Sequence, residues 1–285
     1  MSDDIVGNWI IDPEHSRALR LGMILKCRDE GRDEEVIVEA EELLNSEPDC
    51  PEALFYLGEA FLQLGDAEGA FQAFSRHIQV QPNAQYSAVL GLAMAYFDQC
   101  QLENAESLVR EALQMAPESA KCHYLLGLIL ETDAERSSEA VQHYSAANQL
   151  DPVDHPFPLS LEIAEWKSCV QQAMQGLEQE QKDFWEGLPV HLFAMPDLAE
   201  LMTHQPPISP RITGLYTGTA PEDRDRDGDG DGDGDEDSLR PEGLRLYTRN
   251  LARCRSKEDL IGRIIAVLNQ ERLAWLGLPE ETDTA

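Results

Sequence analysis

A repeat of about 34 residues constrains the fold of this chain more than any other feature of its sequence. Prolines return at a nearly fixed interval, and a small residue, an alanine and a large residue recur in step with them. The recurring positions are Pro48, Pro82, Pro117 and Pro152; Gly58, Ala93 and Gly127; Ala70, Ala105 and Ala140; and Phe74, Val109 and Tyr144. Repeats of this length bury their apolar faces by stacking on one another. The sequence therefore predicts a mainly helical solenoid.

Each repeat unit has the pattern of two helices joined by a turn. In the unit that follows Pro48, residues 51–65 carry apolar side chains at helical spacing. Gly65 and Asp66 supply the turn, and residues 67–82 form a second helix that a proline closes. The small residue lets the two helices pack closely, and the aromatic Phe74 fills the space between them.

These recurring residues resemble the tetratricopeptide repeat. The resemblance covers 51–152 as three units, and residues 17–48 are similar to a fourth, degenerate unit with Gly31 at its turn. The resemblance implies a solenoid over residues 17–152. We expect a capping or linker helix over residues 153–185 to follow this solenoid.

The same resemblance implies a concave, peptide-binding face lined by the first helix of each unit. On this chain the partner-binding residues would be Phe55, Glu59, Leu90, Met94, Tyr124 and Leu128. The lysines and asparagines of the carboxylate-clamp variant are missing there, so we expect a protein or peptide partner with an apolar or basic segment. The alternative is that this stripe is core, or is covered by the chain's own C-terminal domain.

The pattern changes after residue 185. Short apolar runs at 188–196, 211–223 and 243–254 predict strands, and 256–278 predicts an amphipathic helix whose start has Ser256 and Asp259 as a capping box. The order of these elements indicates a small α+β domain over 186–281.

This second domain resembles a small bacterial zincin-like metallopeptidase. The resemblance depends on GLYTG (214–218), LRLYTRNL (244–251), IIAVL (264–268) and LGL (276–278). In that family the last helix carries HExxH, in which two imidazoles hold zinc and the glutamate takes a proton from the bound water.

This chain lacks both histidines of that motif. One alignment places Asn269 and Leu273 there; the other places Gln270 and Ala274 there and keeps Glu271 as a vestigial glutamate. No histidine follows His204, and amide oxygens are poor zinc ligands. We therefore expect a domain without zinc and without peptidase activity. The alternatives are an active zinc peptidase with atypical ligands, and a small sheet with an amphipathic helix that was never a zincin.

An Asp-Gly-rich acidic run occupies 222–238 and matches the spacing of a calcium loop. The matching ligands are Asp225, Asp227, Asp229, Asp231, Asp233 and Glu236, with Gly230 at the sixth position. A repeat of Asp and Gly fills alternate positions in any frame, and Pro221 and Pro241 argue against flanking helices. We expect a self-repelling surface loop, with a calcium-responsive adaptor as the alternative. A further hypothesis is that the run lies against Arg245, Arg249, Arg253 and Arg255.

Composition limits the partners of the chain. Its formal net charge of −32 would repel nucleic-acid phosphates and anionic membranes, so we expect neither as a partner. The six cysteines form no CxxC pair, and we expect reduced thiols, no signal peptide, no membrane span and a cytoplasmic, bacterial protein. The sequence thus predicts an adaptor with no cofactor, and leans against an enzyme.

Overall fold

The computed structural model describes residues 13–83, 85–218 and 241–278. The chain divides into two compact units, residues 1–129 and 130–285, and each is described by itself below. Within the described residues, no helix combines the length and the hydropathy that crossing a membrane requires.

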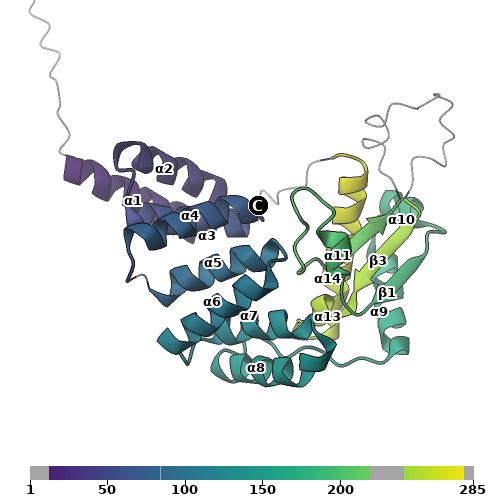
Figure 1. The fold of residues 1–285 in the computed structure, drawn as a ribbon. Coiled ribbons are helices and arrows are strands. Elements are labelled where there is room, and N and C mark those ends of the chain that lie inside the picture. The colour runs from purple at the N-terminus through teal and green to yellow at the C-terminus, as the bar shows by residue number, and fades with distance from the viewer. Residues whose placement is uncertain (1–12, 84, 219–240, 279–285) are drawn as a thin grey trace, which may run out of the picture. The chain divides into compact units, whose positions relative to one another are not determined.

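The first unit is a series of antiparallel helix pairs (Figure 1). Its helices are α1 (Pro13–Asp29), α2 (Asp33–Ser46), α3 (Pro51–Gln63), α4 (Ala67–Val80), α5 (Tyr86–Asp98), α6 (Leu102–Met115) and α7 (Ala120–Glu131), whose last two residues cross into the second unit. Each helix from α1 to α5 packs on the next along the chain, and α3 also packs on α1 and on α5. This arrangement confirms the predicted helical solenoid.

The turn inside each pair depends on one residue in the left-handed region. Gly31 and Gly65 have φ values of 68° and 78°, which glycine adopts without a steric cost. In the next unit Cys100 takes the same place with φ 60°, although a side chain there is strained. After Gly65, the Asp66 carboxylate accepts the backbone N–H of Gly69 at 2.8 Å and caps α4.

The core of the first unit is tightest around Phe74, which is 1% exposed. A Cβ at Gly58 would lie 2.7 Å from its ring, and a Cβ at Gly91 would lie 2.4 Å from it. Two glycines, one on α3 and one on α5, therefore hold the ring between them. The repeat pattern predicted the role of Gly58 but not that of Gly91.

The second unit contains the end of α7, helix α8 and a small sheet domain. Its elements after α7 are η1 (Ala134–Arg136), α8 (Ser137–Leu150), α9 (Ile163–Gly176), α10 (Gln179–Trp185), β1 (Val190–Phe193), α11 (Leu198–Leu201), β2 (Gly214–Thr217), β3 (Gly243–Tyr247), α13 (Thr248–Leu251) and α14 (Lys257–Trp275). The three predicted strands and the closing helix are confirmed. The stretch expected as one helix is two helices, α9 and α10.

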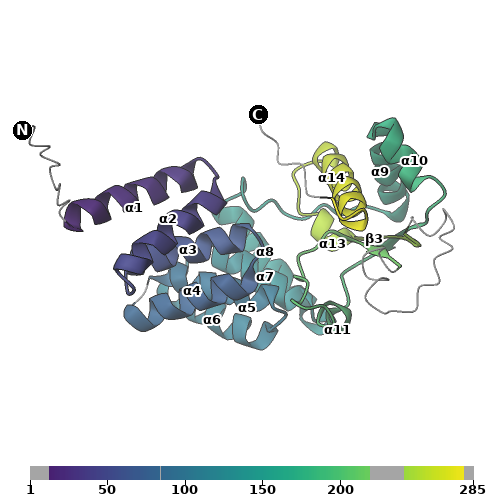
Figure 2. The same ribbon diagram turned by 90° about the horizontal axis from the view of Figure 1, so that it is seen from above.

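The sheet has the strand order β1-β3-β2, with β1 parallel and β2 antiparallel to β3. Helices α9, α10 and α14 lie on the same face of it (Figure 2), and α9 packs on α14. One core joins these layers, and its members include Trp166, Trp185, Leu246 and Leu268. The acidic run lies in the connection between β2 and β3, outside the described residues.

The predicted capping box at the start of α14 is half formed. The Ser256 hydroxyl accepts the backbone N–H of Asp259 at 3.2 Å, as expected. The Asp259 carboxylate instead accepts the backbone N–H of Arg255, also at 3.2 Å. Two backbone N–H groups at the helix start, those of Asp259 and Arg255, are therefore satisfied. In a complete capping box the Asp259 carboxylate would accept the N–H of Ser256 instead of that of Arg255.

Candidate partner-binding surface

The six residues expected to bind a partner all lie on the first helices of their pairs. Phe55 and Glu59 are on α3, one turn apart, and Leu90 and Met94 are on α5, also one turn apart. Tyr124 and Leu128 are spaced in the same way on α7. A helix presents residues four positions apart on one side, so each pair shares a face of its helix.

Burial divides these six residues into two groups. Leu90 is 4% exposed and Leu128 is 5% exposed, so these two offer a partner almost no surface and act as core residues. Phe55, Glu59, Met94 and Tyr124 are partly exposed. Two of the six residues are therefore part of the core, as the alternative interpretation of this stripe had it. The other four form the accessible surface.

Phe55 is fixed in place by aromatic contacts. Its ring lies 5.5 Å from that of Tyr56, 5.9 Å from that of Phe74 and 5.8 Å from that of His77, measured between centroids. The contacts to Tyr56 and Phe74 are edge-to-face, which is favourable for aromatic pairs. Phe55 is therefore a rigid apolar contact rather than a mobile one.

Glu59 is the acidic member of the surface. Burial raises the pKa of its carboxyl group, and the nearby charges of Arg28 and Lys121 oppose that shift. Within the described residues, no hydrogen bond or ion pair reaches this carboxylate. A half-buried carboxylate without a donor is costly, so the site favours a ligand that supplies a cation or an N–H group.

The sequence analysis did not single out Arg28 and Lys121, whose charges lie near Glu59. The Arg28 guanidinium lies over the ring of Tyr56, 5.1 Å from its centroid, and donates to Asp29 at 2.8 Å. Arg28 lies one repeat before Leu62, so extending the repeat comparison to the last turn of the first helices could have found it. The surface thus carries a stacked cation beside the acidic group.

The family comparison bears on the helices that carry this surface. Residues 39–87 and 90–155 match the model described as "Tetratricopeptide repeat". Residues 39–155 are tetratricopeptide repeats. This match confirms that the repeats predicted from the prolines and small residues are of the tetratricopeptide type. The candidate surface lies on the first helices of these units. The match does not extend to the sheet domain.

Comparisons with solved structures return other repeat proteins. A MamA double mutant (MamA RS-1 ArsTM) is 26% identical over 48% of this chain and 75% of its own, with a TM-score of 0.42. A tetratricopeptide protein of Thermus thermophilus, TTC0263, is 22% identical over 48% and 75%, with a TM-score of 0.42. YrrB, described as having an unusual peptide-binding site, is 13% identical over 47% and 68%, with a TM-score of 0.40. No curated protein matches.

In the sheet domain, Glu271 contacts a strand. Its Oε2 accepts the backbone N–H of Tyr216 on β2 at 2.9 Å, and burial raises the pKa of its carboxyl group. Among the residues placed by the structure, no group of three His, Cys, Asp or Glu side chains is arranged to hold a metal ion. The resemblance to a zincin receives no support from the comparisons and stays a prediction, as does calcium binding, because Asp225 through Glu236 lie outside the described residues.

The four arginines that we expected near the acidic run all have other partners. Arg245 donates two hydrogen bonds to Glu200, at 2.7 and 2.6 Å. Arg249 and the buried Arg253 both pair with Glu131 at the end of α7. Arg255 donates to the backbone carbonyl of Val153 at 2.9 Å. These contacts bind the segment after β3 to Glu131 and Val153, and the hypothesis on the acidic run stays a prediction because that run lies outside the described residues.

Proposed function

We propose that this protein is an adaptor that binds a segment of a partner protein on the first helices of its tetratricopeptide repeats. The observation that carries the proposal is Glu59, a half-buried carboxylate to which no described residue donates a hydrogen bond, on the same set of helices as the partly exposed side chains of Phe55, Met94 and Tyr124. Apolar contacts would provide most of the binding energy, and the carboxylate would select the partner.

The partner segment is expected to be apolar with a basic residue. A lysine or arginine placed on Glu59 would supply the missing donor, and the charge of −32 on the chain attracts basic segments in general. Arg28 and Lys121 lie near the same carboxylate, so a segment with several adjacent cations would be repelled. One basic residue flanked by apolar ones fits the surface best.

We propose further that the sheet domain is a scaffold without zinc, related to a metallopeptidase but inactive. The sequence has no histidine after His204, and the Glu271 carboxylate is bound to the backbone of a strand rather than free to act on water. Metal content after dialysis against trace zinc tests this part. Stoichiometric zinc would contradict it.

The adaptor function can be tested with a pair of methionine variants. A random dodecamer library displayed on phage is selected on the full-length protein, and the affinity of the selected peptide is measured. Met94→Lys, on α5, should weaken binding at least tenfold, while Met115→Lys, at the exposed end of α6, should leave it unchanged. Equal effects of the two substitutions, in folded variants, would place binding elsewhere.

A further inference from the structure

The two edges of the small sheet differ in how their backbone groups are satisfied. On β2, the residues that bond to β3 include Thr217, whose carbonyl accepts the N–H of Glu242 at 2.7 Å. Tyr216 therefore points its N–H away from the sheet, and the Glu271 carboxylate accepts it at 2.9 Å. Helix α14 packs along this strand, so the β2 edge is covered.

The β1 edge has no such cover among the described residues. The carbonyl of Pro189 accepts the N–H of Leu244 at 2.9 Å, and the register pairs Val190 with Leu244. In a parallel pair of strands, every second residue directs its N–H and C=O groups toward the neighbouring strand. His191 and Phe193 face β3 in this way, as does the C=O group of Pro189, so Val190 and Leu192 direct their N–H and C=O groups away from β3. No described residue bonds to these groups. Four backbone groups are thus available to a further strand.

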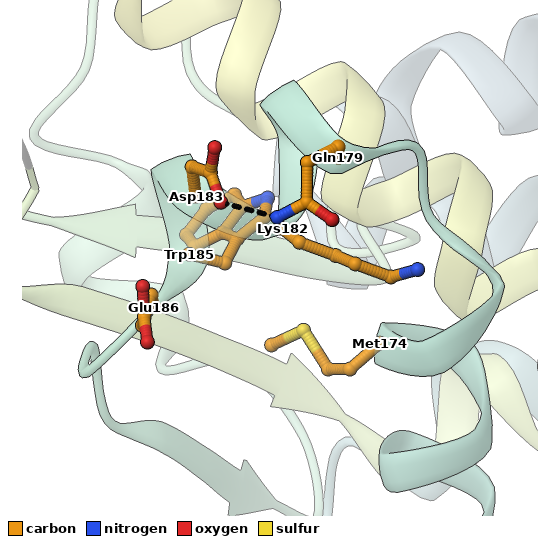
Figure 3. Close-up of a pocket in the computed structure, with 6 residues that line it drawn as sticks. All are labelled: Met174, Gln179, Lys182, Asp183, Trp185 and Glu186. Atoms are coloured by element: carbon orange, nitrogen blue, oxygen red, sulfur yellow. Dashed lines mark hydrogen bonds between the residues drawn. The ribbon is translucent and has the colours of Figure 1, made fainter.

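A hollow of about 340 Å³ lies between α9 and α10 (Figure 3). Met174 of α9 and four residues of α10 line it, and Glu186 completes it. Val190 and Leu192 pack at the rim of the same core as Met174 and Trp185. An added strand would therefore place every second side chain against this apolar rim.

The surroundings of the hollow are acidic. Helix α10 and its two caps carry Glu178, Glu180, Asp183 and Glu186 against the base Lys182, and Glu180 pairs with Arg272 of α14 at 3.1 Å. On the other face of β1, Phe193 is 47% exposed. An incoming segment would meet apolar surface on the helix-covered face and carboxylates around it.

We propose that the β1 edge is a second docking site, which takes an extended segment of a partner protein with alternating apolar and basic side chains as a fourth strand. Backbone hydrogen bonds to Val190 and Leu192 hold the segment, and the apolar rim and the acidic α10 select its side chains. This site lies in the sheet domain, apart from the surface on the repeats, and does not depend on it.

The test uses the full-length protein and a capped heptapeptide of alternating lysine and valine. Amide exchange is followed by NMR at Val190 and Leu192, with the ladder amides of His191 and Phe193 as internal references. The free protein should exchange rapidly at the first two, and saturating peptide should slow that exchange at least tenfold.

Two N-methylated peptides supply the matched control, one methylated on its valines and one on its lysines. Only the N–H groups of one alternate set can face β1, so one methylated peptide should lose binding and the other should keep it. Glu186→Lys should weaken binding about two- to fivefold, whereas Glu118→Lys in the first unit should not.

Three results would overturn the proposal. The first is no slowing of exchange with the unmethylated peptide. The second is equal binding of both methylated peptides, which would mean contact through side chains alone. The third is slow exchange at Val190 and Leu192 in the free protein, which would assign the edge to a segment of this chain.

Discussion

Replacing Gly91 by alanine tests how closely α3 and α5 pack around Phe74. Glycine to alanine inside a helix stabilises by about 0.5–1 kcal/mol. Here the new Cβ would lie 2.4 Å from the Phe74 ring, and overpacking costs about 1–3 kcal/mol. The ring cannot retreat, because α3 packs against it at Gly58, where a Cβ would lie 2.7 Å away. We expect a net loss of up to about 2.5 kcal/mol in the free energy of unfolding.

Gly22 on α1 provides the matched control. No atom lies within 4 Å of a Cβ built there, so Gly22→Ala should stabilise the protein by about 0.5–1 kcal/mol. Urea unfolding followed by far-ultraviolet circular dichroism measures both variants. Adding Phe74→Leu to Gly91→Ala should reduce the cost of the alanine, and a double-mutant cycle gives the coupling. If Gly91→Ala stabilises as much as Gly22→Ala, the packing account of the repeats is wrong.

Two further predictions concern buried charges in the second unit. Arg253→Met should lower the free energy of unfolding by about 3–5 kcal/mol, because the Glu131 carboxylate would lose its buried partner. The control Arg255→Met, at an exposed position, should lower it by less than about 1 kcal/mol. Equal losses for the two variants in urea unfolding would contradict this prediction. Burial raises the pKa of Glu271 in the folded state, so its protonated form is favoured by folding and its contribution to stability is lost as pH rises through that folded-state pKa. Glu271→Gln keeps an oxygen for the N–H of Tyr216 and should remove this loss, so the variant should gain stability relative to the wild type as pH rises from the ordinary glutamate pKa through the raised folded-state pKa of Glu271. A constant difference across that range would refute it.

The repeats were predictable because their signal is local and recurs. Pro82, Gly65 and Phe74 each mark a fixed place in a unit that is complete within about 34 residues. What the repeat pattern missed were features that depend on the neighbouring unit, such as the contact of Gly91 with Phe74. The burial of Leu90 was missed for the same reason. Helical spacing predicts on which side of the helix a side chain lies, but not which neighbouring helix packs on that side.

The sheet domain was predictable as elements but not as a topology. Alternation and turn residues located β1, β2 and β3, yet the order β1-β3-β2 joins segments far apart in the chain. No local pattern shows that β1 runs parallel to β3. The contact of Glu271 with Tyr216 follows from that arrangement, so the sequence could offer only a vestigial role for this glutamate.

The most direct test of the adaptor account is the affinity of Glu59→Gln for the peptide selected on the wild type. Glutamine keeps the size of the side chain and removes its charge, and Glu103→Gln on the exposed part of α6 is the control. Glutamine still accepts a hydrogen bond, and a charge-assisted bond is stronger than a neutral one by about 1–1.5 kcal/mol, so the account predicts binding about 5- to 13-fold weaker for Glu59→Gln and unchanged for Glu103→Gln. Equal affinity of both variants and the wild type would contradict the claim that the first helices of the repeats bind the partner through Glu59.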